Sequence, residues 1–359
     1  MWALGRVTVG LSLSPYLTER FVTDPDLAIR GLTSLLPKES SQDDLADGPC
    51  LGLPTPDSTM NDAPGVDGDF EVCAHCGKQG SETVTLKHCT ACRLVKYCGV
   101  VCQRAHRKRH KKACKQRAAE IKDEQLYSQG HERPEGDFCP ICTLPIPLPM
   151  NEHSALNACC MKRICAGCHF AAQKRGIDDC PFCRTPLPDS DADMLAMTRA
   201  RVAKKDPTAI LTLGQKYFFG DLGLQKDMKK SIELLTEAAE LGSIEALYCL
   251  GLEYSKGGVV QRDEVKAAEF WTKAAMQGHA QSRNNLGCYE GQKGNYDRAL
   301  KHLLISARMG HKDSLENLKK FFKAGLATKQ QYADALKGYQ QAVEETKSHD
   351  RDEAKRLGY

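Results

Sequence analysis

The chain has 359 residues, enough for two or three domains, and its formal net charge is only +4. A charge this small for the length does not by itself indicate binding to nucleic acid or to a membrane surface. No stretch approaches the ~20 consecutive apolar residues of a membrane-spanning helix, so we expect a soluble chain with no membrane partner.

The first 70 residues are interpreted as a disordered tail and linker. Residues 38–70 are rich in Asp, Ser, Gly and Pro and hold few large apolar side chains, so they cannot bury enough surface to order themselves. A moderately apolar run at residues 7–13 leaves a cleaved targeting segment open as an alternative.

The distribution of cysteines indicates the class of protein. Of 18 cysteines, 15 lie between Cys73 and Cys183, and ten of these form Cys-x-x-Cys pairs. Such a turn brings two thiolates within reach of one tetrahedral ion, so the pairs favour zinc over a disulfide framework. A reducing compartment follows, cytoplasmic or nuclear. The pairs are Cys73/Cys76, Cys89/Cys92, Cys139/Cys142, Cys165/Cys168 and Cys180/Cys183.

The segment 73–114 is the first predicted zinc module. It holds eight ligand-type residues but little apolar content, so bound metal must supply most of its folding free energy. His110 and Cys114 stand four residues apart, on one face of a helix, and can reach one ion. The order Tyr97-Cys98-x-x-x-Cys102-Gln103, closed by His110-x-x-x-Cys114, resembles a MYND finger.

This resemblance implies two interleaved zinc sites and the binding of short proline-rich peptides from partner proteins. A Trp that often precedes the last His of the family is absent, and Arg107-Lys108-Arg109 stand there. The implied sites are Cys73, Cys76, Cys98 and Cys102 for one ion, and Cys89, Cys92, His110 and Cys114 for the other.

A basic stretch closes this module. Residues 104–117 hold eight Lys or Arg, which leaves nucleic-acid binding or a nuclear address as alternatives. No aromatic residues are interleaved for base stacking, so we prefer the solvated face of a helix and do not expect a nucleic-acid partner. Residues 115–137 are interpreted as a charged linker.

The segment 138–188 is the second predicted zinc module. Cys139-Pro-Ile-Cys142 and Cys180-Pro-Phe-Cys183-Arg184 resemble the two ends of a RING domain. The resemblance implies one site of Cys139, Cys142, Cys165 and Cys168, and another of Cys159, Cys160, Cys180 and Cys183. Because Cys159 and Cys160 are adjacent, His153 or His169 remains an alternative ligand in place of one of them. Two modules of this kind predict about four zinc ions per chain.

A RING resemblance also implies an activity. RING domains often act as ubiquitin ligases by positioning a loaded ubiquitin-conjugating enzyme rather than by covalent chemistry. Ile141 and Pro181 would line the groove for that enzyme, Phe170 is the one bulky candidate after the sixth ligand, and Arg184 would contact ubiquitin. The alternative is a purely structural module in which these side chains only pack.

The C-terminal half is repetitive. An Ala/Ser-x-x-x-Leu-Gly pattern recurs with its glycines at Gly214, Gly251 and Gly287, spaced by 37 and 36 residues. A period of this length with small-residue landmarks indicates stacked helix pairs. The pattern resembles the Sel-1-like repeat, a relative of the tetratricopeptide repeat whose arrays hold other proteins. We assign residues 206–342 to this array and 343–359 to a C-terminal tail.

The sequence therefore predicts a mostly α protein, with two small cross-braced zinc modules ahead of an α-solenoid. No catalytic residue is assigned, because no hydrolase or phosphate-loop pattern occurs and the zinc ions would be fully ligated by protein. The expected function is a zinc-binding adaptor for other proteins, either as a RING-type ubiquitin ligase whose repeats select substrate or as a non-enzymatic scaffold.

Overall fold

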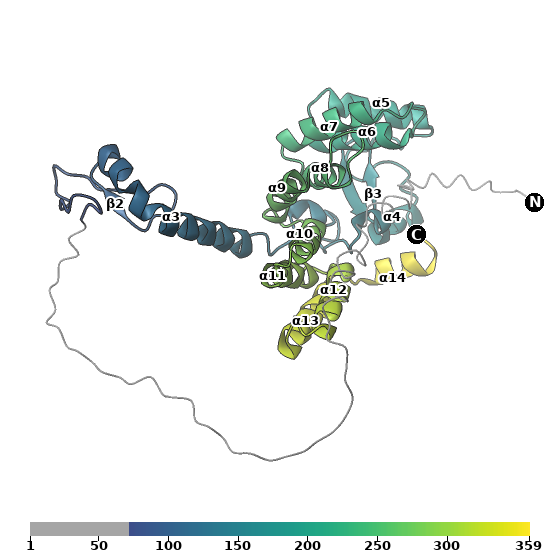
Figure 1. Cartoon of the computed structure of the whole chain (residues 1–359). Helices are drawn as coiled ribbons and strands as arrows, with labels where there is room; N and C mark the ends of the chain where they lie inside the picture. The colour runs from purple at the N-terminus through teal and green to yellow at the C-terminus, as the bar shows by residue number, and fades with distance from the viewer. Residues whose placement is uncertain (1–71) are drawn as a thin grey trace, which may run out of the picture. The chain divides into compact units, whose positions relative to one another are not determined.

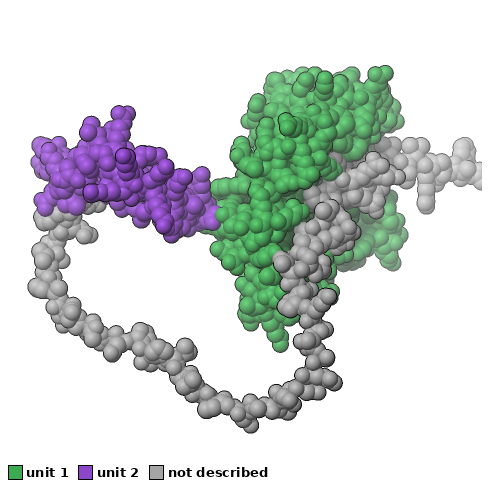
Figure 2. Space-filling model, viewed as in Figure 1, with its two compact units in different colours: residues 1–35, 126–359 green, residues 36–125 purple. Residues whose placement is uncertain are grey.

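The computed structural model describes residues 72–359, which divide into two compact units, 72–125 and 126–359 (Figures 1 and 2). Each unit is described by itself. The interpretation of residues 1–70 as a tail, and the alternative of a targeting segment, lie outside the described residues. None of the described helices is long and apolar enough to cross a membrane.

The first unit is a finger with hardly any apolar core. Two short antiparallel strands, β1 (Lys87–His88) and β2 (Lys96–Tyr97), pair with Lys87 opposite Tyr97, and helix α3 (Val100–Ser128) follows. Its buried cluster consists of three cysteines and Tyr97. Cysteines are therefore the core of this unit, as expected where metal binding replaces hydrophobic burial.

Helix α3 runs further than the sequence interpretation suggested, because residues 115–128 of the assigned linker continue it. Arg117 bonds to Glu120 at 3.1 Å and to Glu124 at 2.7 Å, and such pairs along one face support a polar helix. A helix supported by charge pairs has no apolar periodicity. Residues 115–128 therefore carry no periodic pattern that predicts a helix.

The second unit begins with a compact cysteine module. Strands β3 (Ser154–Asn157) and β4 (Lys162–Cys165) form an antiparallel hairpin with Leu156 opposite Arg163, and α4 (Ala166–Lys174) follows at once. The Sγ of Cys165 caps α4 by accepting the N–H of Cys168 at 3.4 Å. Buried Ile146 and Ile164 pack among the cysteines.

The rest of the second unit contains a stack of helix pairs in sequence order, α6 with α7, α8 with α9 and α10 with α11, preceded by α5. Asp206, Ser243 and Asp263 cap the helices that follow them through backbone N–H bonds. The helices are α5 (Asp191–Val202), α6 (Pro207–Phe219), α7 (Met228–Glu240), α8 (Ile244–Lys256), α9 (Glu264–Ala275), α10 (Ala280–Gln292), α11 (Tyr296–Arg308), α12 (Lys312–Lys323), α13 (Lys329–Glu345) and α14 (His349–Arg356).

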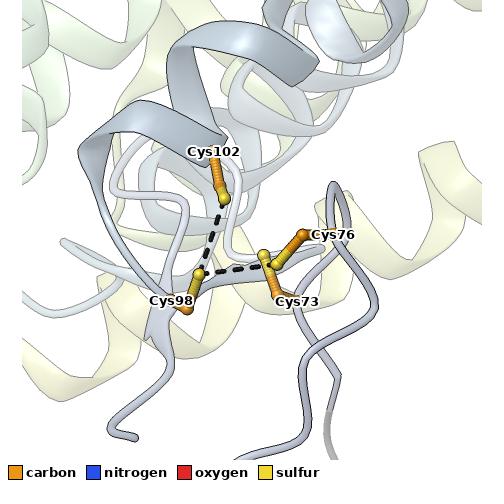
Figure 3. A group of neighbouring side chains, drawn as sticks. All are labelled: Cys73, Cys76, Cys98 and Cys102. Atoms are coloured by element: carbon orange, nitrogen blue, oxygen red, sulfur yellow. Dashed lines mark hydrogen bonds between the residues drawn. The ribbon is translucent and has the colours of Figure 1, made fainter.

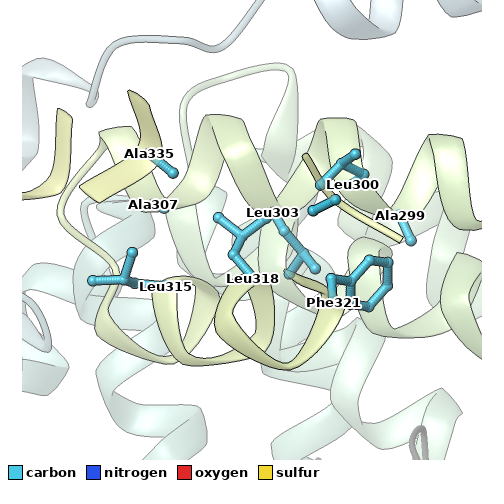
Figure 4. Close-up of a cluster of buried hydrophobic side chains, with 9 residues drawn as sticks. Ala299, Leu300, Leu303, Ala307, Leu315, Leu318, Phe321 and Ala335 are labelled. Carbon is cyan, nitrogen blue, oxygen red and sulfur yellow. The ribbon is translucent and has the colours of Figure 1, made fainter. Parts of the chain in front are cut away.

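The repeated glycines let the helices of a pair approach closely. A Cβ added to Gly287 on α10 would lie 2.8 Å from Cγ of Leu303 on α11, and one added to Gly214 would lie 3.3 Å from Cβ of Leu234. Interiors packed at this density have no room for an added methyl group. Buried apolar clusters then lie along the stack, and Figure 4 shows the last of them around Leu303, Leu318 and Phe321.

The C-terminal residues pack against other parts of the second unit. Helix α14, which the sequence analysis assigned only to a tail, packs against α4 of the cysteine module. Lys174 on α4 forms an ion pair with Glu353 on α14 at 3.0 Å, and the ring of Phe170 lies 4.9 Å from that of Tyr359. The C-terminus therefore joins the cysteine module to the repeats within this unit.

Candidate metal centres

The first unit brings its eight ligand-type residues together in two groups. In each group, one ligand atom per residue lies within 4.8 Å of all the others. Figure 3 shows the first group, in which Sγ of Cys98 lies 3.7 Å from Sγ of Cys76 and 3.5 Å from that of Cys102. The groups are Cys73, Cys76, Cys98 and Cys102, and Cys89, Cys92, His110 and Cys114.

These spacings suit a metal ion. A tetrahedral ion with Zn–S bonds of ~2.3 Å holds its sulfurs about 3.8 Å apart, whereas a disulfide requires ~2.05 Å. In the second group Cys89 and Cys114 have their Sγ atoms 3.8 Å apart, and Nε2 of His110 lies 3.2 Å from Sγ of Cys92. Helix α3 supplies both His110 and Cys114 from one face, one turn apart.

The cysteine module of the second unit contains two further groups of four. Sγ of Cys142 lies 3.8 Å from that of Cys165, and Sγ of Cys160 lies 3.7 Å from that of Cys180. Members of each group come from alternate pairs along the chain, so the two groups interleave. The groups are Cys139, Cys142, Cys165 and Cys168, and Cys159, Cys160, Cys180 and Cys183.

The adjacent cysteines both belong to the last group. Cys159 lies 3.3 Å from Cys183, Sγ to Sγ, while Cys160 faces Cys180. The turn between β3 and β4 allows this, because Met161 adopts a left-handed backbone conformation with φ of 56°. His153 and His169 belong to neither group of this module.

Hydrogen bonds within the module favour one thiolate, that of Cys139, whereas the pKa of Cys165, which donates to it, is raised by the same bond. The pKa of Cys139 is lowered to about 4, chiefly by a hydrogen bond from the Cys165 side chain and further by backbone N–H groups, including that of Cys165. A thiol that ionises this easily is a ready metal ligand. Zinc at such a site would act as a structural cross-link, because four protein ligands fill its tetrahedral shell.

Arg351 of α14 adds a contact that sequence reasoning missed. Its guanidinium donates to Sγ of Cys142 at 3.3 Å and to the carbonyl oxygens of Leu144 and Pro145 at 3.2 and 2.6 Å. Gly167 on α4 makes room, because a Cβ there would lie 2.8 Å from Cγ of Arg351. A cation beside a metal-binding thiolate offsets part of the negative charge of a four-cysteine site. Nothing local in the sequence marks this arginine, which is 209 residues from Cys142.

The residues predicted to contact a ubiquitin-conjugating enzyme or ubiquitin differ in their exposure to solvent. Ile141 is 48% exposed, and Arg184 is exposed with a left-handed backbone. Pro181 is half-buried. Phe170 packs on Tyr359 of the C-terminus and under the Lys174 ammonium, so the chain itself covers part of it.

Comparison with known proteins identifies two of the three modules. The MYND finger family matches residues 73–114, and the Sel1 repeat family matches residues 207–243, 244–279 and 280–311. The chain thus contains a MYND finger, which implies zinc binding, and three Sel1 repeats. Both are protein-interaction modules, so they support an adaptor for other proteins. Neither match covers the cysteine module at residues 138–188.

Two curated relatives resemble part of the chain. A rat protein named DAP3-binding cell death enhancer 1 is 34% identical over 117 residues, which is 32% of this chain and 23% of the relative. The mouse protein of the same name is 34% identical over 100 residues, 27% of this chain and 19% of the relative. The chain therefore matches about a fifth of the length of these proteins.

Two solved structures share some likeness with part of the chain. A Sel1 repeat protein from Oxalobacter formigenes is 22% identical, with a TM-score of 0.39 over 50% of this chain and 71% of the other. A protective antigen of uropathogenic Escherichia coli described as having an SLR fold is 19% identical, with a TM-score of 0.29 over 54% of each chain.

Proposed function

We propose that the protein is a non-enzymatic zinc-dependent scaffold, in which the RING-like module is a structural part of the repeat unit. The observation that carries this is the packing of α14 on α4, with Tyr359 on Phe170 and Arg351 on Cys142. A module whose helix face is covered by its own chain has less surface for an enzyme partner. Zinc ions in all four groups, about four per chain, would hold both modules in shape.

Partner binding then belongs to the MYND finger and the repeats. The MYND finger would take short proline-rich peptides, as the family resemblance implies. The rat relative is named for binding DAP3, so DAP3 is the first protein to test. We expect purified DAP3 to bind the full zinc-loaded chain in calorimetry. Cys98→Ser, which removes a ligand of the finger, would separate finger-dependent from repeat-dependent binding.

A RING-type ubiquitin ligase is the second candidate, and the exposed Ile141 and Arg184 favour it. The test adds the full chain to a panel of ubiquitin-loaded conjugating enzymes and measures ubiquitin discharge. A scaffold leaves the discharge rates unchanged, both for the full chain and for a chain ending at residue 346. Acceleration that Ile141→Ala and Arg184→Ala abolish would establish the ligase instead. Acceleration by the shortened chain alone would identify α14 as a cover over an active module.

A further inference from the structure

Helix α3 of the MYND finger carries a band of exposed positive charge. Its residues 100–119 include eight Lys or Arg and no Asp or Glu. Seven of the eight are exposed, and within residues 72–359 no carboxylate pairs with any of these seven. Six of them fall within an arc of about 140° around the helix axis. We call these six the basic face: Arg104, Arg107, Lys108, Lys111, Lys112 and Lys115.

The metal ligands determine the direction in which the basic face points. His110 and Cys114 both belong to one ligand group of the finger, and His110 is buried there. With 3.6 residues per turn, Arg104, Lys108 and Lys115 lie together on the side of α3 that turns away from His110. The finger therefore holds the basic face toward solvent.

The basic face has no counter-charge on its own helix. Lys108 stands four residues from both Arg104 and Lys112, and like charges at this spacing repel each other. The first turn of α3 holds no acidic residue, although the positive end of a helix dipole favours one. Beyond residue 119 the helix does pair its charges, because Arg117 bonds to Glu120 at 3.1 Å. An external anion would thus relieve repulsion in the first half only.

Two exposed valines adjoin the basic face. Val100 is 60% exposed and Val101 is 80% exposed. Val101 lies three residues before Arg104 and seven before Lys108, which places it on the same side of the helix. A phosphate backbone has no contact to offer a valine, and a helix that lies in a membrane interface has a whole apolar face rather than two residues. An acidic polypeptide with interspersed apolar side chains fits this surface better than either.

The chain itself contains such a polypeptide next to the finger. Residues 39–71, which we call the acidic segment, hold nine Asp or Glu and no Lys or Arg, with Leu45, Leu51 and Leu53 among them. The segment joins the finger directly at Val72. Fully extended, residues 57–71 alone span up to about 45 Å, whereas the basic face is about 17 Å long. A segment tethered so closely has an effective concentration in the millimolar range.

We propose that the acidic segment binds the basic face of the same chain and shields it from other polyanions. Its carboxylates pair with the exposed Lys and Arg, and its leucines contact Val100 and Val101. A partner reaches the basic face only by displacing the segment, so the segment sets a threshold of charge and concentration for entry. This inference goes beyond the adaptor function, and neither depends on the other.

Cross-linking of the full zinc-loaded chain with a zero-length carbodiimide, followed by peptide mass spectrometry, tests the contact. We expect links between lysines of the basic face and carboxylates of the acidic segment at low salt. At about 1 M salt, where the screening length is ~3 Å, these links should disappear. A mixture of ordinary and ¹⁵N-labelled chain distinguishes links within one chain from links between chains. Exposed Lys319, Lys323 and Lys329 of the repeat unit are the reference lysines.

The probe for shielding is a short fluorescent DNA duplex, and its affinity is measured by fluorescence polarisation at low salt. Neutralising four carboxylates of the acidic segment should raise affinity for the duplex by about tenfold or more over the parent chain. A control that neutralises four exposed carboxylates of the repeat unit should keep the parent affinity. The changes are Asp43→Asn, Asp44→Asn, Asp57→Asn and Asp62→Asn in the segment, and Glu240→Gln, Glu269→Gln, Glu316→Gln and Glu345→Gln in the control.

A third variant locates the shielded surface. Lys108→Gln, Lys111→Gln and Lys115→Gln, added to the neutralised segment, should remove the gain in affinity. The same three substitutions at the reference lysines should leave the gain intact. Equal zinc content in all variants shows that the finger keeps its metal ligands.

Several results would overturn the proposal. Cross-links only between different chains, cross-links that reach the reference lysines equally often, or no cross-links to the acidic segment would each do so. The same holds for a neutralised segment that leaves the affinity unchanged, for an equal gain in the control, and for a gain that survives the loss of the three lysines of the basic face. Binding of DAP3 and of proline-rich peptides is measured separately, so either proposal can fail alone.

Discussion

His302 is expected to make the free energy of unfolding of the repeat unit depend on pH. The side chain is completely buried on α11, between Arg283 and Tyr127. Arg283 can only donate, so Nδ1 of His302 accepts at 3.5 Å, and Nε2 carries the proton toward the Tyr127 oxygen at 3.4 Å. Burial, together with the charges of Arg283 and Arg298, lowers the pKa of His302 to about 3.

The sign of the effect follows from this direction. An unfolded histidine takes up a proton below pH ~6.5, whereas the folded one remains neutral until about pH 3. Between these values the unfolded state binds one more proton, so the free energy of unfolding falls as pH falls. From pH 7.5 to 5.5 this histidine alone removes about 1.4 kcal/mol of stability.

The measurement is urea unfolding of the full chain with excess zinc, between pH 5.5 and 7.5. A Trp2→Phe background leaves Trp271, buried in the repeat core, as the fluorescence probe. We expect His302→Gln to lose about 1.4 kcal/mol of the pH-dependent change relative to the parent chain. His349→Gln, on the exposed α14, should retain all of it. The zinc sites and His311 are the same in all variants. Their contributions to the pH dependence therefore cancel when a variant is compared with the parent chain. Full pH dependence in His302→Gln would refute the assignment of an uncharged buried histidine.

Further predictions concern the metal sites and the packing. Elemental analysis of the purified chain should find about four zinc ions, and Cys139→Ser should lower the count by one; a count near two would remove one module from the zinc assignment. Gly287→Ala should destabilise the repeats in urea by about 1–3 kcal/mol because its methyl group meets Leu303, while Gly136→Ala, with open space around it, should not. Arg351→Ala should cost about 1–3 kcal/mol and expose α14 amides to hydrogen exchange, and unchanged exchange would mean that α14 docks without it.

The candidate metal ligands were proposed from cysteine spacing in the chain alone. Spacing such as Cys73-x-x-Cys76 is a local property, because a tight turn places both sulfurs on one side whatever surrounds it. The repeat period was readable for a similar reason, since each landmark glycine such as Gly287 meets its own neighbouring helix. The polar helix α3 beyond residue 114 was missed, because its support comes from charge pairs rather than apolar spacing.

Only the tertiary structure determined which residues of the cysteine module contact the repeats and α14 within the second unit. Arg351 reaches Cys142 across 209 residues, and the β3–β4 hairpin lines one cavity together with α10 and α12, which lie more than 100 residues later in the chain. Contacts of this kind depend on how a zinc module packs against a stack of helices, and no local pattern encodes that packing. The sequence by itself indicated the candidate metal ligands and the repeat architecture, because turn geometry and helix periodicity act over a few residues. The packing of α14 on α4 and the cavity between the hairpin and the helices arise from long-range burial, which only the folded chain determines.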